Sequence, residues 1–276
     1  MASKISKERT ISSIVLVIIA LATILPGGVI LAVTLYLISN VAFLELTKAC
    51  GIRNGKKLNE LEITGMIAIA IYYLLIYFAQ THTYFMITVV LLLMALMFVY
   101  VFSYPKYTAN QVMTTYFSLI YAPVMLSFIF LTRQLSYGVY LVWMIFISSW
   151  ISDTCAYLVG VLFGKHKLAP VLSPKKSIEG SIGGIAGSAI VGALFGFFLL
   201  DKTLGGYMFG ITLFIVGAVG SVISQVGDLA ASAIKRNHDI KDYGNLIPGH
   251  GGIMDRFDSV IFTAPMVYFL FILLLK

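Results

Sequence analysis

Charged residues are scarce in this chain. Asp, Glu, Lys and Arg make up 11% of its 276 residues, against roughly 25% in ordinary soluble domains. So few charges cannot cover the surface of a soluble fold, and disorder requires low hydrophobicity with high net charge, so both classes are excluded. Cysteine is also scarce, because Cys50 and Cys155 are too few and too scattered for a disulfide framework or a zinc site.

Long apolar runs take the place of charge, since 59% of the residues are hydrophobic. A run of about 20 apolar residues crosses a bilayer, and the short alternating segments of a β-barrel do not occur. We therefore predict an all-α polytopic membrane protein with about nine transmembrane helices. The predicted spans are 11–25, 28–47, 63–79, 84–102, 109–131, 137–163, 180–200, 206–234 and 259–275.

The first two spans are separated only by Pro26-Gly27-Gly28. One long kinked helix is the alternative, but we predict a break, because Pro interrupts helices and the combined run is longer than one span needs. We expect no cleavable signal peptide, because no small-residue cleavage site follows the first run.

Basic residues fix the predicted orientation. With the N-terminus in the cytoplasm, sixteen of the nineteen basic residues fall in cytoplasmic segments. Those sixteen are Lys4, Lys7, Arg9, Lys48, Arg53, Lys56, Lys57, Lys106, Lys165, Lys167, Lys175, Lys176, Lys235, Arg236, Lys241 and Arg256. The outside segments hold Arg133, Lys202 and Lys276. This asymmetry obeys the positive-inside rule, so we predict a cytoplasmic N-terminus and an outside C-terminus.

Glycine divides the chain unevenly, with six in residues 1–138 and eighteen in residues 139–276. Small residues four apart, as in Gly183-x3-Gly187, Gly192-x3-Gly196 and Gly206-x3-Gly210, let membrane helices approach closely, and we interpret these pairs as packing contacts. We predict that 1–138 forms a scaffold of spans one to five. Residues 139–276 would form the catalytic region, with spans six to nine and their cytoplasmic loops.

Two carboxylates lie within predicted spans. Asp153 is in span six and Asp228 is near the cytoplasmic end of span eight; such residues usually face a wet cavity or a cation, and a neighbouring Lys or Arg is the structural alternative. Ser221, Ser224 and Gln225 share a helix face with Asp228. Polar residues of this kind also join helices, but their convergence on a carboxylate favours the lining of a cavity.

The loop between spans six and seven contains a candidate phosphate site. Ser177 is predicted to cap span seven, whose helix N-terminus would present free amides to an anion. Lys175 and Lys176 come just before it. The alternative is that these lysines only obey the positive-inside rule.

The last cytoplasmic loop carries the densest set of polar residues. Lys235, Arg236, Lys241 and Arg256 alternate with acids, and Gly249, Gly251 and Gly252 allow amides to approach a ligand. Asp255 and Asp258 share a helix face if span nine begins there. Together with Asp228 they form a set of hard oxygen ligands suited to Mg²⁺ that bridges phosphates. The alternative is that the two acids only favour a helix N-terminus.

These residues resemble the signature of the phosphatidate cytidylyltransferase (CDP-diacylglycerol synthase) family. The signature runs Ser-x-apolar-Lys-Arg-x4-Lys-Asp-x-small-x2-apolar, then Pro/Gly/Ser-x-His-Gly-Gly-apolar-x-Asp-Arg-apolar-Asp, and 232–258 match every specified position. Upstream, the stretch 153–160 matches one further block and the stretch 173–184 another, with Ser177 where Thr is commoner. The resemblance covers about 150–276.

The resemblance implies that CTP and phosphatidic acid react to give CDP-diacylglycerol and pyrophosphate with Mg²⁺. It implies a multi-pass protein of the inner (cytoplasmic) membrane, with its active site on the cytoplasmic side. The expected partners are CTP, phosphatidic acid and the lipid bilayer, with no nucleic acid; a homodimer is compatible with the sequence. The metal ligands would be Asp153, Asp228, Asp255 and Asp258. The substrate-binding residues would be Lys175, Lys176, Lys235, Arg236, Lys241, Arg256, Ser221, Ser224, Gly251 and Gly252. His250 would orient a phosphate or the leaving group.

Two other functions remain open from the sequence. A CTP-dependent lipid kinase of the polyprenol type would share the cationic loops and the metal, but it would transfer the γ-phosphoryl group to an alcohol. An ion-coupled secondary transporter would use Asp153 and Asp228 for its coupling ion. The full signature argues against the kinase, and the lack of an internal repeat argues against the transporter.

Overall fold

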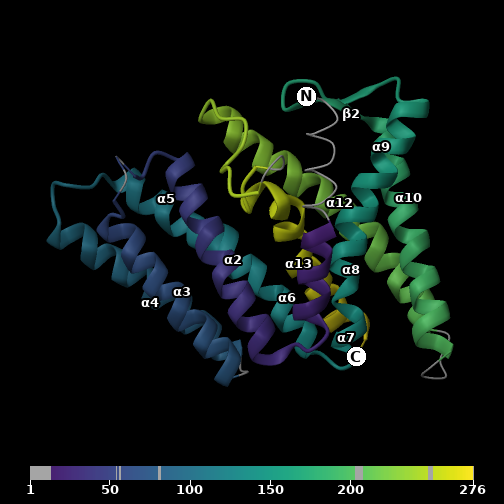
Figure 1. The fold of residues 1–276 in the computed structure, drawn as a ribbon, viewed down its shortest axis with the longest axis horizontal. Helices are drawn as coiled ribbons and strands as arrows, with labels where there is room; N and C mark the ends of the chain where they lie inside the picture. The colour runs from purple at the N-terminus through teal and green to yellow at the C-terminus, as the bar shows by residue number, and fades with distance from the viewer. Residues whose placement is uncertain are drawn as a thin grey trace. The chain divides into compact units, whose positions relative to one another are not determined.

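The computed structural model describes residues 14–53, 55, 57–79, 82–202, 208–247 and 251–275, and most of them are helical (Figure 1). Within these residues, seven helices are long and apolar enough to cross a membrane. They are Gly28–Ala49, Glu60–Phe78, Ala109–Gln134, Gly138–Phe163, Ile178–Asp201, Phe209–Asn237 and Met254–Leu274. The prediction of an all-α membrane protein is therefore confirmed.

Two shorter apolar helices, Ile14–Ile24 and Met86–Phe102, lie where the other two spans are predicted. The predicted break between the first two spans is confirmed. The first helix ends at Ile24 and α2 (Gly28–Ala49) begins at Gly28. Gly27 and Gly28 have φ values of 66° and 51°, a left-handed conformation that glycine adopts without steric cost.

The chain divides into two compact units. Unit 1 consists of Met1–Phe130 and His238–Arg256, and unit 2 consists of Leu131–Asn237 and Phe257–Lys276. The part of the signature from His238 to Arg256, called here the signature loop, is thus grouped with the first half of the chain. The predicted division at residue 138 concerns function and stays a prediction.

Unit 1 is a helical layer built from long apolar segments. Its elements are α2, α3 (Glu60–Ala79), α4 (His82–Phe102), α5 (Ala109–Leu119), η1 (Ile120–Val124) and the start of α6 (Met125–Gln134). Helix α3 packs against α2, α4 and α5. Phe43, Leu46 and Leu61 are fully buried between them, so the apolar runs supply both the core and the outward-facing surface.

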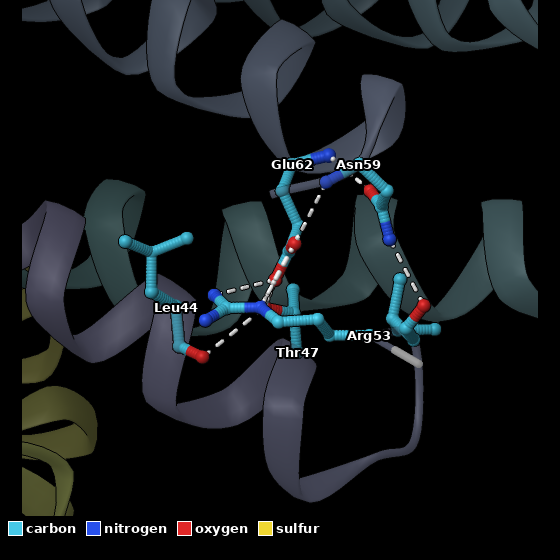
Figure 2. A network of polar contacts seen from close by, with 6 residues as sticks. Leu44, Thr47, Arg53, Asn59 and Glu62 are labelled. Carbon is cyan, nitrogen blue, oxygen red and sulfur yellow. Dashed lines mark hydrogen bonds and ion pairs between the residues drawn. The ribbon is translucent and has the colours of Figure 1, made fainter. Parts of the chain in front are cut away.

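A largely buried ion pair joins the loop after α2 to the start of α3 (Figure 2). Arg53 Nη2 lies 2.8 Å from Glu62 Oε1, and Arg53 Nε donates to both oxygens of this carboxylate. Glu62 is fully buried and also accepts the Thr47 hydroxyl at 2.9 Å. The Asn59 side chain accepts the Glu62 N–H at 2.8 Å, and the Glu62 carboxylate accepts the Asn59 N–H at 3.2 Å. This reciprocal capping box fixes where α3 begins.

Unit 2 is arranged around α10. Its elements are the end of α6, α7 (Gly138–Leu141), α8 (Trp143–Phe146), η2 (Ile147–Ile151), α9 (Ser152–Phe163), β1 (Lys167–Ala169), β2 (Ser173–Ser177), α10 (Ile178–Phe195), η3 (Gly196–Asp201), α12 (Met208–Asn237) and most of α13 (Met254–Leu274). Helix α10 packs against both α9 and α12. In Figure 1 it runs beside α9, with β2 near one end of the pair.

Glycines make these close helix contacts. A Cβ atom at Gly183 would lie 2.5 Å from Val159 of α9, and one at Gly187 would lie 2.5 Å from Cys155 Sγ. On the other side of α10, a Cβ at Gly192 would lie 2.5 Å from the carbonyl oxygen of Leu213 in α12. The interpretation of these glycines as packing contacts is confirmed. Gly206 lies outside the described residues.

The largely buried Arg53–Glu62 pair predicts a large loss of stability when the charge of Glu62 is removed. Glu62→Gln leaves a mostly buried guanidinium without its countercharge, which typically costs about 3–5 kcal/mol. We expect a clearly lower thermal unfolding midpoint in detergent. The matched control is Glu60→Gln on the same helix turn, because the ion pair of Glu60 with Lys106 is half exposed and such pairs contribute little. Equal midpoints for the two variants would contradict the buried role of Glu62.

Candidate functional site

A pocket of about 570 Å³ opens in unit 2, within the size range typical of small-molecule sites. Residues of α9, the β1–β2 hairpin, the start of α10 and α12 line it. The lining residues are Asp153, Ala156, Tyr157, Gly160, Val161, Lys167, Leu168, Ser173, Lys175, Lys176, Ser177, Gly180, Ser181 and Gln225. Three lysines and one carboxylate in a single pocket indicate a ligand that carries negative charge.

The β1–β2 hairpin places the lysines of the pocket. The two strands are antiparallel, with Lys167 opposite Ser177 and Ala169 opposite Ser173. The backbone pairing holds this part of the loop in one shape, so that Lys167, Lys175 and Lys176 all line the pocket. The sequence identified the loop but not the strands, because three and five residues with a proline give no clear alternation.

Ser177 caps α10, as predicted. Its hydroxyl accepts the Gly180 N–H at 3.2 Å. The serine is packed closely, since a Cβ at Gly160 would lie 3.0 Å from Ser177 Oγ and one at Gly164 would lie 2.7 Å from it. Glu179, in the first turn, accepts the Lys165 N–H at 3.0 Å and lies 2.6 Å from His166 Nδ1. The helix start and the beginning of the hairpin therefore hold each other in place beside the pocket.

Three of the predicted acidic residues gather in unit 2. Asp228 of α12 forms an ion pair with Lys176. Asp258 of α13 is partly buried and interacts electrostatically with Asp228, Asp153 and Lys235. Asp153 is exposed and lines the pocket. The alternative considered for Asp228, a neighbouring lysine, is thus present, and the same lysine lines the pocket.

The polar stripe of α12 serves partly as contacts between helices. Ser221 is buried, and its hydroxyl lies 2.6 Å from that of Ser152. Gln225 lines the pocket and accepts a hydrogen bond from the Ser181 hydroxyl at 2.5 Å. Ser224 is fully buried, and its hydroxyl has no hydrogen-bond partner among the described residues. Only Gln225 of these three lines the pocket, and substrate binding by Ser221 and Ser224 stays a prediction.

The signature loop of unit 1 is held by two carboxylates. Asp255 Oδ2 accepts the Tyr243 N–H at 2.8 Å and the Gly252 N–H at 3.0 Å. Glu45 of α2 accepts the Ile253 N–H at 3.2 Å and the Met254 N–H at 2.8 Å. The Gly252 amide therefore already has a protein partner, and Asp255, predicted as a metal ligand, supports the loop through one of its oxygens.

The remaining predicted residues have different environments. Lys235 is partly buried and interacts with Asp258, whereas Arg236 and Lys241 are exposed. Arg256 is partly buried, and its Nε atom has no hydrogen-bond partner among the described residues. Gly251 has a φ of 84°, and a single bridge pairs it with Ile247. His250 lies outside the described residues.

In the described part of unit 2, the carboxylates do not form a complete cage for a metal ion. Among the described residues, no group of three His, Cys, Asp or Glu side chains is arranged to hold a metal ion. Mg²⁺, however, is commonly held by one or two carboxylates together with substrate phosphates and water, rather than by a cage of protein ligands. The neighbouring Asp228 and Asp258, beside a pocket with lysines, fit that second arrangement.

Sequence reasoning missed three of these residues. Glu45 has partners more than two hundred positions away in the sequence, so no local pattern points to it. Lys167 was counted as one more basic residue. Ser181 lies among the small residues of a predicted span, where nothing distinguishes it in the sequence. The only signals in the sequence were the position of Glu45 beside the end of a span and the position of Ser181 next to Gly180.

Comparisons with known proteins agree with the signature. The cytidylyltransferase family matches residues 7–274 of this chain. A protein of Staphylococcus saprophyticus named phosphatidate cytidylyltransferase is 35% identical over 269 residues, which cover 96% of this chain and 99% of the relative. Proteins of the same name from Staphylococcus aureus and Staphylococcus haemolyticus are 35% and 34% identical, with the same coverage. The chain belongs to the cytidylyltransferase family.

Proposed function

We propose that this chain is a phosphatidate cytidylyltransferase, which transfers CMP from CTP to phosphatidic acid and releases pyrophosphate. One observation carries the proposal on the structural side. The pocket of unit 2 places three lysines and the capped start of α10 beside Asp153, with Gln225 on its wall. Relatives with this name match the chain over almost its full length, and the signature 232–258 is complete.

The chemistry suits a site rich in cations and carboxylates. An oxygen of the phosphatidate phosphate forms a bond to the α-phosphorus of CTP, and the bond from that phosphorus to the bridging oxygen breaks, so that pyrophosphate leaves with the electron pair. The second pKa of a phosphomonoester is about 6, so this nucleophile is already anionic near neutral pH and needs no general base. Catalysis then consists of positioning and of neutralising charge.

The residues of unit 2 divide this work. Lys167, Lys175 and Lys176 neutralise phosphate oxygens in the pocket, and the amides at the start of α10 add the positive end of the helix dipole. Asp228 orients Lys176 through their ion pair. Asp228, Asp258 and Asp153 would hold Mg²⁺, which, when bound, neutralises the charge that develops on the triphosphate. In the signature loop, which belongs to unit 1, the resemblance alone assigns Lys241 and Arg256 to phosphate and Asp255 to metal.

The membrane arrangement belongs to the same proposal. Nine spans, with a cytoplasmic N-terminus and an outside C-terminus, would bring both cationic loops to the cytoplasmic face of the inner membrane. CTP is soluble in the cytosol and phosphatidic acid keeps its acyl chains in the bilayer, so the reacting atoms must meet at that interface. The long apolar helices and the distribution of basic residues support this orientation.

Labelled substrates test the reaction directly. Purified protein in detergent is given phosphatidic acid, diacylglycerol or polyprenol with CTP labelled at either the α- or the γ-phosphorus. We expect only α-label to enter lipid, and only with phosphatidic acid, because CMP is the group transferred. Incorporation of γ-label into diacylglycerol or polyprenol would identify a lipid kinase and overturn the proposal.

Asp228→Asn tests the carboxylates of unit 2. We expect at least ~100-fold lower kcat, by analogy with the loss of single electrostatic groups at active sites, and a higher Mg²⁺ concentration for half-maximal rate. Asp239→Asn is the matched control, because Asp239 is exposed and occupies an unspecified signature position. If Asp228 served only to orient Lys176, the variant would lose rate without any change in its Mg²⁺ dependence, and that result would overturn the assignment of Asp228 to metal.

Cysteine labelling tests the orientation. Single cysteines replace Leu246, which is 60% exposed, and Lys202, in a background that lacks both native cysteines. Burial raises the pKa of the Cys50 thiol. Since the thiolate is the form that reacts, native Cys50 would give little background labelling. A membrane-impermeant thiol reagent on intact cells should label position 202 and leave position 246 unlabelled. Labelling at position 246 from outside would place the signature loop on the wrong side of the membrane.

A further inference from the structure

Glu45 is a charged residue of α2 that the proposed mechanism does not use. Its two carboxylate oxygens accept different backbone amides, Oε1 from Ile253 at 3.2 Å and Oε2 from Met254 at 2.8 Å. These amides stand at the start of α13, where the first amides of a helix have no partner within the helix. Glu45 therefore supplies from α2 the cap that the sequence next to α13 does not provide.

Two glycines of the signature make room for this carboxylate. A Cβ at Gly252 would lie 2.4 Å from both carboxylate oxygens of Glu45, and one at Gly244 would lie 2.3 Å from Oε1. Neither glycine has a left-handed φ, whereas Gly251 does. At positions 244 and 252, glycine thus leaves the space that the Glu45 carboxylate occupies, and a Cβ atom there would displace that carboxylate.

Asp255 holds the loop from within. Its Oδ2 atom accepts the amides of Tyr243 and Gly252, so two carboxylates together engage four amides of residues 243–254. Asp255 and Lys48 both interact electrostatically with Glu45. These bonds fix the backbone at Tyr243 and at residues 252–254, and Lys241 and Arg256 each lie two residues from a fixed position.

We propose that Glu45 is a positioning residue for catalysis, which holds the glycine-rich signature loop in the shape that presents Lys241 and Arg256 to phosphate. This inference rests on the proposed function for what the loop does, but its structural part concerns only the loop itself. It also gives α2, in the half of the chain predicted as scaffold, an indirect part in catalysis through the loop that Glu45 holds.

Glu45→Gln is the first test. Glutamine keeps the volume but places an NH₂ group against one of the two amides, so one of the capping hydrogen bonds is lost. Small displacements of positioned groups can lower rates by up to about 100-fold, and we expect kcat/KM for CTP to fall by ~10-fold or more. The matched control is Glu62→Gln, at a fully buried carboxylate of unit 1, which contacts Thr47, Arg53 and Asn59 instead of the loop.

The control separates positioning from stability. Glu62→Gln should lower the unfolding midpoint, yet leave kcat and KM of the folded protein unchanged. Hydrogen–deuterium exchange should become faster in peptides covering 243–254 for Glu45→Gln and stay unchanged there for Glu62→Gln. This exchange is measured without substrate, so it tests the inference even if the proposed reaction is wrong. Unchanged exchange in Glu45→Gln, or kinetic changes equal in both variants, would overturn the inference.

The second test approaches from the loop and serves even if Glu45→Gln folds poorly. Gly252→Ala places a methyl group where the Glu45 carboxylate lies, so we expect at least a 10-fold loss of kcat/KM. In a Glu45→Ala background the obstruction is gone, and adding Gly252→Ala should lower kcat/KM little further. Such non-additivity is the mark of two groups in contact. If the losses of kcat/KM in the two single variants multiply in the double variant, Gly252 is needed for a reason other than contact with Glu45, and the inference fails.

Discussion

Amides at the start of a helix have no partner within the helix, and a helix that enters a membrane cannot leave them bare where water is excluded. This chain satisfies them with side chains. The acceptors are Asn59 and Glu62 at α3, Thr108 at α5, Ser177 at α10, Asp201 at α12 and Glu45 at α13. At α10 and α13 these contacts also hold described residues next to the helix start, namely the start of the β1–β2 hairpin and residues 252–253. The candidate site is built on these two helix starts.

The kind of cap decides what a helix start can bind. At α10 the cap is a neutral hydroxyl, and Glu179 of the first turn is engaged by the amides of Lys165 and His166. The pocket lysines stand beside that start, so an anion is attracted there. At α13 the amides of residues 252–254 already donate to carboxylates. These three amides are therefore engaged within the protein, and the proposed phosphate binding by this loop is assigned to Lys241 and Arg256.

The sequence predicted whatever depends on local pattern. Apolar runs predicted the helices, and Pro26 with the two glycines after it predicted the first break. Ser177 was predicted as a helix cap because it comes just before an apolar run. Contacts between distant residues could not be predicted in this way. Nothing in the local sequence pairs Ser152 with Ser221, or Glu45 with Met254. Short strands with few side chains of clear preference, as in the β1–β2 hairpin, also leave no periodic signal.

Glu45 shows why a complete signature is not a complete site. The stretch 232–258 is divided between the two units, and its middle part, His238–Arg256, belongs with the first half of the chain. Two of its glycines have a physical reason outside the signature, because Glu45 of α2 fills the space beside them. On this proposal, a substitution of Glu45 would disturb the shape of the loop although no residue of the signature had been changed. The residues that set the loop's shape must be sought among its packing partners as well as within the motif.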